Sequence, residues 1–237
     1  MHLLPAKATR KIISSTGEAS CHSQTNLRSC FNVRIVSLHR AGEPLLNKRL
    51  ETYIEHLTEL GIYVTVSSNC SLLSDERSHR LVKAGLRMVG TDFCADPALY
   101  ERLRVTGVWR ETLNGIRQLL LASVDLAADV RVVIKDMPTH SVPPKDAKLL
   151  MERTRELFAD WAERVTVMPV YLHNALGESL ATLSNGPQAR EWTHYTLCHQ
   201  PCANFTIDFH GRMVGCCRDL RSEYVLGNLL EQSADAI

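Results

Sequence analysis

From residue 33 onward, short apolar runs alternate with longer segments in which apolar residues recur every three or four positions. The short runs are rich in β-branched residues and predict strands, whereas the longer segments predict amphipathic helices. Five strands are expected, at residues 33–38, 62–67, 86–92, 130–134 and 164–170. The intervening helices are expected at residues 47–61, 74–85, 96–104, 109–124 and 144–162.

This regular alternation predicts the fold class. Successive βαβ units build a parallel sheet with right-handed crossovers, and continuously apolar strands indicate that helices cover the sheet. The chain is therefore expected to be an α/β protein whose parallel strands form either an open sheet or part of a barrel. In both architectures the functional residues lie at the carboxyl ends of the strands.

The two ends of the chain have different patterns. Residues 1–32 are rich in Ser, Thr, Lys and Arg and show no clear period, so an atypical or disordered segment is expected there. A transit peptide is an alternative, because Glu18 is its only acidic residue, and a stretch foreign to the protein is another. A second module is expected at residues 181–237, in which residues 204–216 predict a hairpin that turns at His210 and Gly211.

Composition narrows the possible functions. Among the 237 residues, 45% are hydrophobic and 22% are charged, as in an ordinary globular protein. The net charge of +1 gives no reason to expect a nucleic-acid or membrane partner. No apolar run reaches the roughly 18 residues of a membrane span, and no secretory signal is apparent. A cytoplasmic location is therefore predicted.

Three of the expected strands end in polar residues. The first is followed by Gly42, Glu43 and Pro44, the second carries Ser67, Ser68 and Asn69, and the third carries Thr91 and Asp92. On one rim these residues would bind a small polar ligand. The glycine lets the backbone approach, the carboxylate accepts an ammonium, and Ser or Asn bonds to a ribose. Each signal alone is weak, because a Gly-Glu-Pro sequence is usually only a turn.

The eight cysteines give a sharper signal. In a reducing compartment, clustered cysteines suggest a metal site or catalysis before disulfides. Cys198 and Cys216 flank the hairpin with the spacing Cys-x(12)-Gly-x(4)-Cys, which suits zinc or an iron–sulfur cluster. Adjacent strand residues point to opposite faces, so only one of Cys216 and Cys217 is expected to join Cys198. A packing role is expected for Cys202, and a buried strand end remains the alternative for Cys216 and Cys217.

Several of these motifs, in this order, resemble the radical SAM superfamily and its SPASM-containing subgroup. The sequence "AGEP" at residues 41–44 is similar to the family's Gly-Gly-Glu-Pro, and "SSNCSLLS" is similar to its Thr-Asn-Gly stretch. The segment that begins "TDFCADPALYERLR" resembles the fourth strand and the following helix, which places Thr91 and Arg104 at positions that contact SAM. Residues 198–237 resemble the start of a SPASM domain.

The resemblance implies a partial (β/α)6 TIM-like barrel at residues 33–180, followed by a small SPASM-like hairpin module. It implies the cofactors S-adenosylmethionine (SAM) and 4Fe–4S clusters, and an oxidoreductase or a peptide or protein maturase that generates a 5′-deoxyadenosyl radical. Glu43 would be a buried carboxylate that accepts the methionyl ammonium, because a buried carboxylate at a strand end is costly unless it meets a cation. Gly42, Ser67, Asn69, Thr91 and Arg104 would complete the SAM site, and Cys198 and Cys216 would bind metal. The expected partners are a flavodoxin- or ferredoxin-like electron donor and a peptide or small-molecule substrate.

The chain departs from the family in one decisive motif. It contains no Cys-x(3)-Cys-x(2)-Cys, since Cys21 and Cys30 alone precede Glu43. No catalytic residue is therefore assigned, and this chain by itself is expected to be inactive. No counterpart of the first barrel strand is expected. An incomplete chain of a full enzyme, prone to aggregate or dimerise, is one interpretation. A degenerate, non-catalytic binding module with zinc or iron–sulfur at the hairpin is the other.

Overall fold

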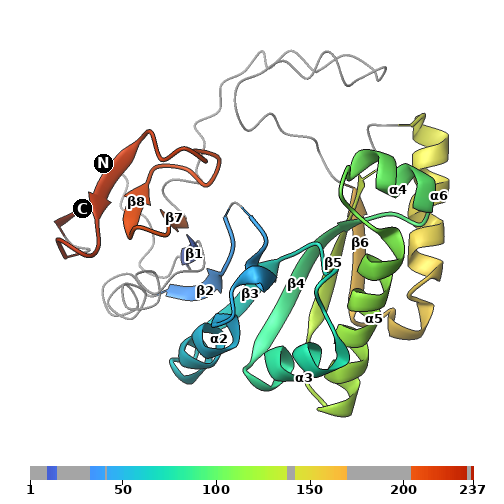
Figure 1. Cartoon of the computed structure of the whole chain (residues 1–237), viewed down its shortest axis with the longest axis horizontal. Coiled ribbons are helices and arrows are strands. Elements are labelled where there is room, and N and C mark those ends of the chain that lie inside the picture. Colours follow the sequence, from blue (N-terminus) through green and yellow to red (C-terminus); the bar gives the residue numbers. More distant parts are fainter. Residues whose placement is uncertain (1–9, 15–32, 41, 138–141, 170–203, 234–235) are drawn as a thin grey trace, which may run out of the picture. The chain divides into compact units, whose positions relative to one another are not determined.

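The computed structural model describes residues 10–14, 33–40, 42–137, 142–169, 204–233 and 236–237 (Figure 1). The chain forms two compact units. One comprises Met1–Val66 and His194–Ile237, and the other comprises Ser67–Thr193. The predicted boundary between residues 180 and 181 lies outside the described residues. Within the described part, no helix is long and apolar enough to cross a membrane.

The first unit contains a mixed sheet in the strand order β3-β2-β1-β7-β8-β9. Strands β1 to β3 and β7 run parallel to one another, and β8 and β9 are antiparallel additions. The bounds are Arg10–Ser14 for β1, Val33–Ser37 for β2, Tyr63–Ser67 for β3, Asn204–Ile207 for β7, Arg212–Val214 for β8 and Val225–Asn228 for β9. The 3-10 helix η1 (Pro44–Leu46) and helix α2 (Leu50–Glu59) connect β2 to β3.

Strand β1 corrects an expectation from the sequence. Residues 1–32 were expected to be atypical, with no counterpart of the first barrel strand, yet Arg10–Ser14 pairs with β2 on one side and β7 on the other. The sequence "RKIIS" contains only two apolar residues, which is too short for a recognisable period. Its backbone hydrogen bonds to two neighbouring strands supply the order that its composition does not predict.

The second unit contains the parallel strands β4, β5 and β6 with helices between them. The strands span Leu86–Phe93, Arg131–Asp136 and Val165–Pro169. The helices are α3 (Asp75–Lys83), α4 (Pro97–Leu103), α5 (Trp109–Asp125), α6 (Pro144–Glu156) and the 3-10 helix η3 (Ala159–Trp161). All five predicted strands after residue 33 are therefore confirmed, as is the predicted hairpin.

Local signals explain where these elements begin and end. The Ser74 hydroxyl accepts a hydrogen bond from Arg77 N at 3.2 Å and caps α3. Asp96 caps α4 through Leu99 N at 2.8 Å. The helix α3 ends before Gly85, whose φ of +103° is left-handed. These polar caps and the glycine explain why the sequence pattern located both helices within a few residues.

The two faces of the pair β4–β5 differ in burial. Val89, Thr91 and Phe93 are buried together with their register partners on β5. The Phe93 ring stacks on Trp109 with centroids 5.7 Å apart, so this face packs against the helices. Asp92 and its register partner Lys135 lie on the opposite face and are partly exposed. That second face is the one accessible to a ligand.

Candidate functional site

Gly42 and Glu43 lie in the loop that follows β2, in the first unit. Gly42 has a φ of +94°, and no atom lies within 4 Å of the position a Cβ would occupy. Glu43 was expected to be buried, but it is half-exposed, and its Oε1 accepts a hydrogen bond from Leu45 N at 3.0 Å. The carboxylate thus caps η1.

Ser67 and Asn69 lie in the second unit, at the end of β3 and in the turn after it. Both are half-exposed. The Oδ1 atom of Asn69 accepts hydrogen bonds from Ser71 N at 2.9 Å and from Ser71 Oγ at 2.8 Å. Ser68 N donates to Gly90 O at 2.9 Å, which brings this turn beside the carboxyl half of β4. These two hydrogen bonds from Ser71 fix the side chain of Asn69 in its turn.

This turn packs closely on helix α5. A Cβ added to Gly115 would lie 1.9 Å from the carbonyl oxygen of Cys70. Cys70 is buried and has a φ of +62°, an unusual conformation for a residue with a side chain. Gly115 is therefore the residue that lets the helix approach the backbone next to Asn69.

Thr91 does not lie on the exposed face of β4, where a ligand-facing residue was expected. Its side chain lies on the helix-covered face of β4 and is fully buried. Among the described residues its hydroxyl oxygen has no hydrogen-bond partner. An unsatisfied buried hydroxyl costs free energy unless a ligand or water bonds to it. The contact of Thr91 with a cofactor stays a prediction.

Arg104 belongs to a charge cluster on the exposed face of β4 and β5. Its Nη2 atom donates to Asp92 Oδ2 at 2.6 Å, and Lys135 Nζ lies 4.0 Å from Asp92 Oδ1. The Nε atom of Arg104 is buried and without a hydrogen-bond partner in the described part of the chain. Two cations share one carboxylate here, so the cluster has a net charge of about +1 and suits an anion such as a carboxylate.

Asp92 was expected on the rim but was given no role at the site, and Lys135 was not predicted. Asp92 immediately follows Thr91, and the alternation of a strand places their side chains on opposite faces. Lys135 could not be assigned from sequence, because its position beside Asp92 depends on the register between β4 and β5.

Of the predicted metal ligands, Cys216 is described and Cys198 lies outside the described residues. Cys216 is half-exposed in the turn after β8, and its sulfur accepts a hydrogen bond from Arg218 N at 3.5 Å. Burial raises the pKa of the neighbouring Cys217 thiol, which disfavours its thiolate form. Within the described ranges no three His, Cys, Asp or Glu side chains form a metal-binding group.

Asp208 organises the hairpin that leads to Cys216. Its carboxylate is fully buried, accepts hydrogen bonds from Arg212 Nε at 2.7 Å and from Ser222 Oγ at 2.9 Å, and is bonded by two backbone amides. Burial alone would raise the pKa of Asp208, but these hydrogen bonds, led by those from Arg212, hold it below its ordinary value. The hairpin and the turn after Cys216 are thus joined through one ionised side chain.

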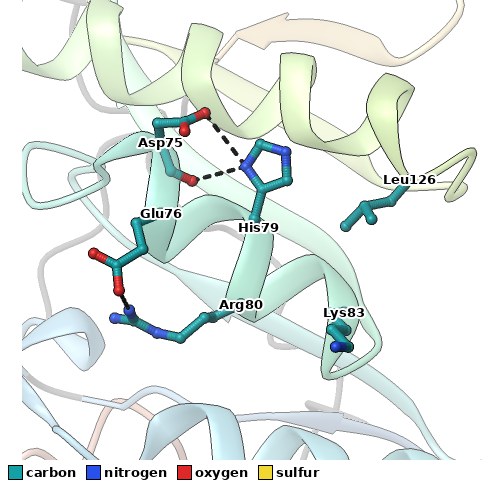
Figure 2. A pocket seen from close by; sticks show the side chains of 6 residues that line it. All are labelled: Asp75, Glu76, His79, Arg80, Lys83 and Leu126. Atoms are coloured by element: carbon teal, nitrogen blue, oxygen red, sulfur yellow. Dashed lines mark hydrogen bonds and ion pairs between the residues drawn. The ribbon is translucent and has the colours of Figure 1, made fainter.

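A surface hollow at the helices α3 and α5 contains none of the predicted site residues (Figure 2). It is lined by Asp75, Glu76, His79, Arg80, Lys83 and Leu126. His79 Nδ1 lies 3.0 Å from the Asp75 carbonyl oxygen and 3.3 Å from the Asp75 carboxylate. Its Nε2 lies 3.4 Å from Asp125 Oδ2, at the end of α5. These contacts, above all the hydrogen bond to the Asp75 backbone, raise the pKa of His79.

The imidazolium of His79 is expected to stabilise the pairing of α3 with α5 in a pH-dependent way. A raised pKa in the folded state means that this contribution is present at acidic pH and is lost as the pH rises through the folded-state pKa. Asp125→Asn should lower the His79 pKa, measured by NMR titration, whereas Asp160→Asn on an exposed 3-10 helix should not. An unchanged His79 pKa in Asp125→Asn would contradict this assignment.

Known proteins resemble this chain at two levels: a family model matches its C-terminal residues, and solved structures match nearly its whole length. Residues 198–237 match the family model of the SPASM iron–sulfur cluster-binding domain. No curated protein sequence matches the chain. Among solved structures, BtrN in complex with AdoMet and 2-DOIA has a TM-score of 0.57 at 16% sequence identity. The match covers 97% of this chain and 81% of the BtrN chain.

Two further structures have the same fold. The enzyme anSMEcpe, with bound AdoMet and the Cp18Cys peptide, has a TM-score of 0.66 at 11% identity, covering 96% of this chain and 79% of its own. Streptococcus suis SuiB bound to S-adenosylmethionine has a TM-score of 0.51 at 13% identity, covering 95% of this chain and 64% of its own. The predicted resemblance is confirmed: the chain has the fold of the radical SAM/SPASM enzymes, and its residues 198–237 match the SPASM iron–sulfur cluster-binding domain.

Proposed function

We propose that this chain is the SAM-binding and SPASM part of a radical SAM/SPASM enzyme. The observation that carries the proposal is the Asp92–Arg104–Lys135 cluster at the end of β4, on the face that the helices leave open. The cluster has a net charge of about +1, and the Nε–H of Arg104 has no hydrogen-bond partner among the described residues. Both features suit the carboxylate of a methionyl group. The half-exposed Glu43 carboxylate suits the methionyl ammonium.

The same ligand is proposed for the remaining predicted residues. Gly42 leaves open space where another residue would carry a Cβ, so a ligand can approach the backbone. Asn69 is fixed in its turn by Ser71 and has an amide nitrogen suited to a ribose hydroxyl. In the family that this chain resembles, bound SAM supplies a 5′-deoxyadenosyl radical when one electron cleaves its sulfonium C5′–S bond. This step needs a three-cysteine cluster whose motif the chain does not contain.

The proposal extends to substrate and partners. BtrN was crystallised with 2-DOIA, anSMEcpe with the Cp18Cys peptide, and SuiB with the precursor peptide SuiA. By analogy of fold we propose a peptide or a small molecule as the substrate, and a flavodoxin- or ferredoxin-like protein as the electron donor. Cys216, with Cys198, is proposed to bind an iron–sulfur cluster in the SPASM segment.

The purified chain is expected to bind SAM without cleaving it, as measured by equilibrium dialysis and by assay for 5′-deoxyadenosine under strong reductant. Arg104→Met should weaken binding about tenfold or more, because a charge-assisted hydrogen bond contributes roughly 1.5–3 kcal/mol. Arg102→Met, an exposed arginine of the same helix, should bind like the wild type.

Failure of the wild-type chain to bind SAM would overturn the proposal. Anaerobic reconstitution separates the two metal interpretations. Iron and sulfide retained by the SPASM segment, and lost in Cys216→Ser, would support the enzyme. Stoichiometric zinc at the same segment would favour a non-catalytic binding module.

A further inference from the structure

Arg40 connects two sites that the proposed function treats separately. It lies three residues before Glu43 in the loop after β2. Its Nη1 atom donates to Ser222 Oγ at 3.1 Å, and its Nη2 atom donates to the carbonyl oxygen of Asp219. Ser222 and Asp219 belong to the turn that follows Cys216. All of these residues lie in the same compact unit.

The turn that Arg40 binds is continuous with the cluster-binding cysteine. Asp219 N donates to Cys216 O at 3.1 Å, and Ser222 N donates to Asp219 O at 3.1 Å. The Asp219 carboxylate accepts hydrogen bonds from Glu223 N and Tyr224 N, each at 2.9 Å. A displacement of the Asp219 carbonyl would therefore also move the backbone of Cys216, to which the Asp219 amide is hydrogen-bonded.

Ser222 attaches the same turn to the buried centre of the hairpin. Its side chain is only 8% exposed, and its φ of +54° is unusual for a residue with a side chain. Its hydroxyl donates to Asp208 and accepts from Arg40. The path Arg40–Ser222–Asp208 thus consists of direct hydrogen bonds between partly or fully buried groups, which are little screened by water.

We infer that Arg40 is a positioning residue that couples cluster binding at the Cys216 turn to SAM binding at the Glu43 loop. The inference rests on the proposed function. An iron–sulfur cluster that orders the turn would hold the Arg40 guanidinium in place. Because Arg40 lies three positions before Glu43 in the sequence, this would restrain the start of the loop that carries the carboxylate. Because coupling between two sites is reciprocal, bound SAM would also favour retention of the cluster.

The test compares SAM affinity before and after reconstitution of the SPASM segment with iron and sulfide. In the wild type, cluster loading should strengthen SAM binding about fivefold or more, the lower range of typical coupling between sites. Arg40→Met should reduce this ratio to less than about twofold, since a methionine makes neither hydrogen bond. Ser222→Ala removes one contact and keeps the Asp219 carbonyl contact, so an intermediate ratio is expected.

Arg34→Met is the matched control, because Arg34 is an exposed arginine on the same strand β2. It should keep the wild-type ratio. Iron content and the electron paramagnetic resonance spectrum of the reduced cluster show whether each variant still binds the cluster, and circular dichroism shows whether it is folded. Those readouts separate loss of coupling from loss of structure.

Two outcomes would overturn the inference while leaving the proposed function intact. One is a wild-type protein whose SAM affinity does not change on cluster loading. The other is a folded, cluster-loaded Arg40→Met variant with the wild-type ratio. Absence of SAM binding by the wild type in both states would instead overturn the proposed function, and the inference with it.

Discussion

Replacement of Asp136 by asparagine is expected to remove a pH-dependent loss of stability of roughly 3 kcal/mol that the wild type has undergone by pH 8. Asp136 ends β5 and is fully buried. Burial raises its pKa from 3.8 to about 6, against the opposing effects of a hydrogen bond from Thr154 and the charge of Arg155. An asparagine has nearly the same shape, can still accept the Thr154 hydrogen bond, and carries no charge to desolvate.

The sign of the pH dependence follows from the direction of this shift. The pKa of the folded state lies above that of the unfolded chain, so the unfolded state releases its proton first as the pH rises. The wild type therefore loses stability between about pH 4 and pH 6–7, and the loss is complete above that range. Asp136→Asn should lack this loss, so its advantage should be greater at pH 8 than at pH 5.

Denaturant unfolding of both proteins at pH 5 and pH 8 measures this advantage. Asp160→Asn serves as the control, because Asp160 is an exposed aspartate of the same unit, and its stability difference should not change with pH. If the stability difference between Asp136→Asn and the wild type did not grow from pH 5 to pH 8, the assigned pKa shift would be wrong.

Gly115→Ala is expected to destabilise the protein by about 2 kcal/mol, although alanine is the better helix former. Helix propensity alone would favour alanine by about 1 kcal/mol in the interior of α5. The new Cβ, however, would lie 1.9 Å from the Cys70 carbonyl oxygen, which is backbone and cannot rotate away. Overpacking of this kind typically costs about 1–3 kcal/mol and occasionally more. The clash should therefore outweigh the propensity.

The same substitution should weaken SAM binding, because separation of α5 from the turn displaces Asn69. Thermal and denaturant unfolding measure the first effect, and equilibrium dialysis measures the second. Asn114→Ala is the matched control: Asn114 is the exposed neighbour of Gly115, so its replacement should be neutral or slightly stabilising and should leave SAM affinity unchanged. A stabilised Gly115→Ala with normal binding would show that the turn does not depend on this contact.

The candidate site was only partly predictable from sequence. Gly42, Glu43, Ser67 and Asn69 were predicted because each follows an apolar strand, and the carboxyl end of a parallel strand is a general position for ligands. The burial of Glu43 was misjudged, because the 3-10 helix that it caps depends on how Pro44 and Leu45 pack. Asp92 was placed on the same rim as Thr91, although strand alternation puts their side chains on opposite faces.

Local sequence by itself determined the strands and helices after residue 33, since periods of two and of 3.6 residues, polar caps and terminal glycines are encoded by near neighbours. The hairpin and the SPASM spacing were determined in the same way. Only the tertiary structure decided which distant residues meet: β1 between β2 and β7, Asp92 with Arg104 and Lys135, and Arg40 with Ser222. These contacts depend on the register between strands and on segments far apart in the sequence coming together. The residue pattern of a single segment predicts neither.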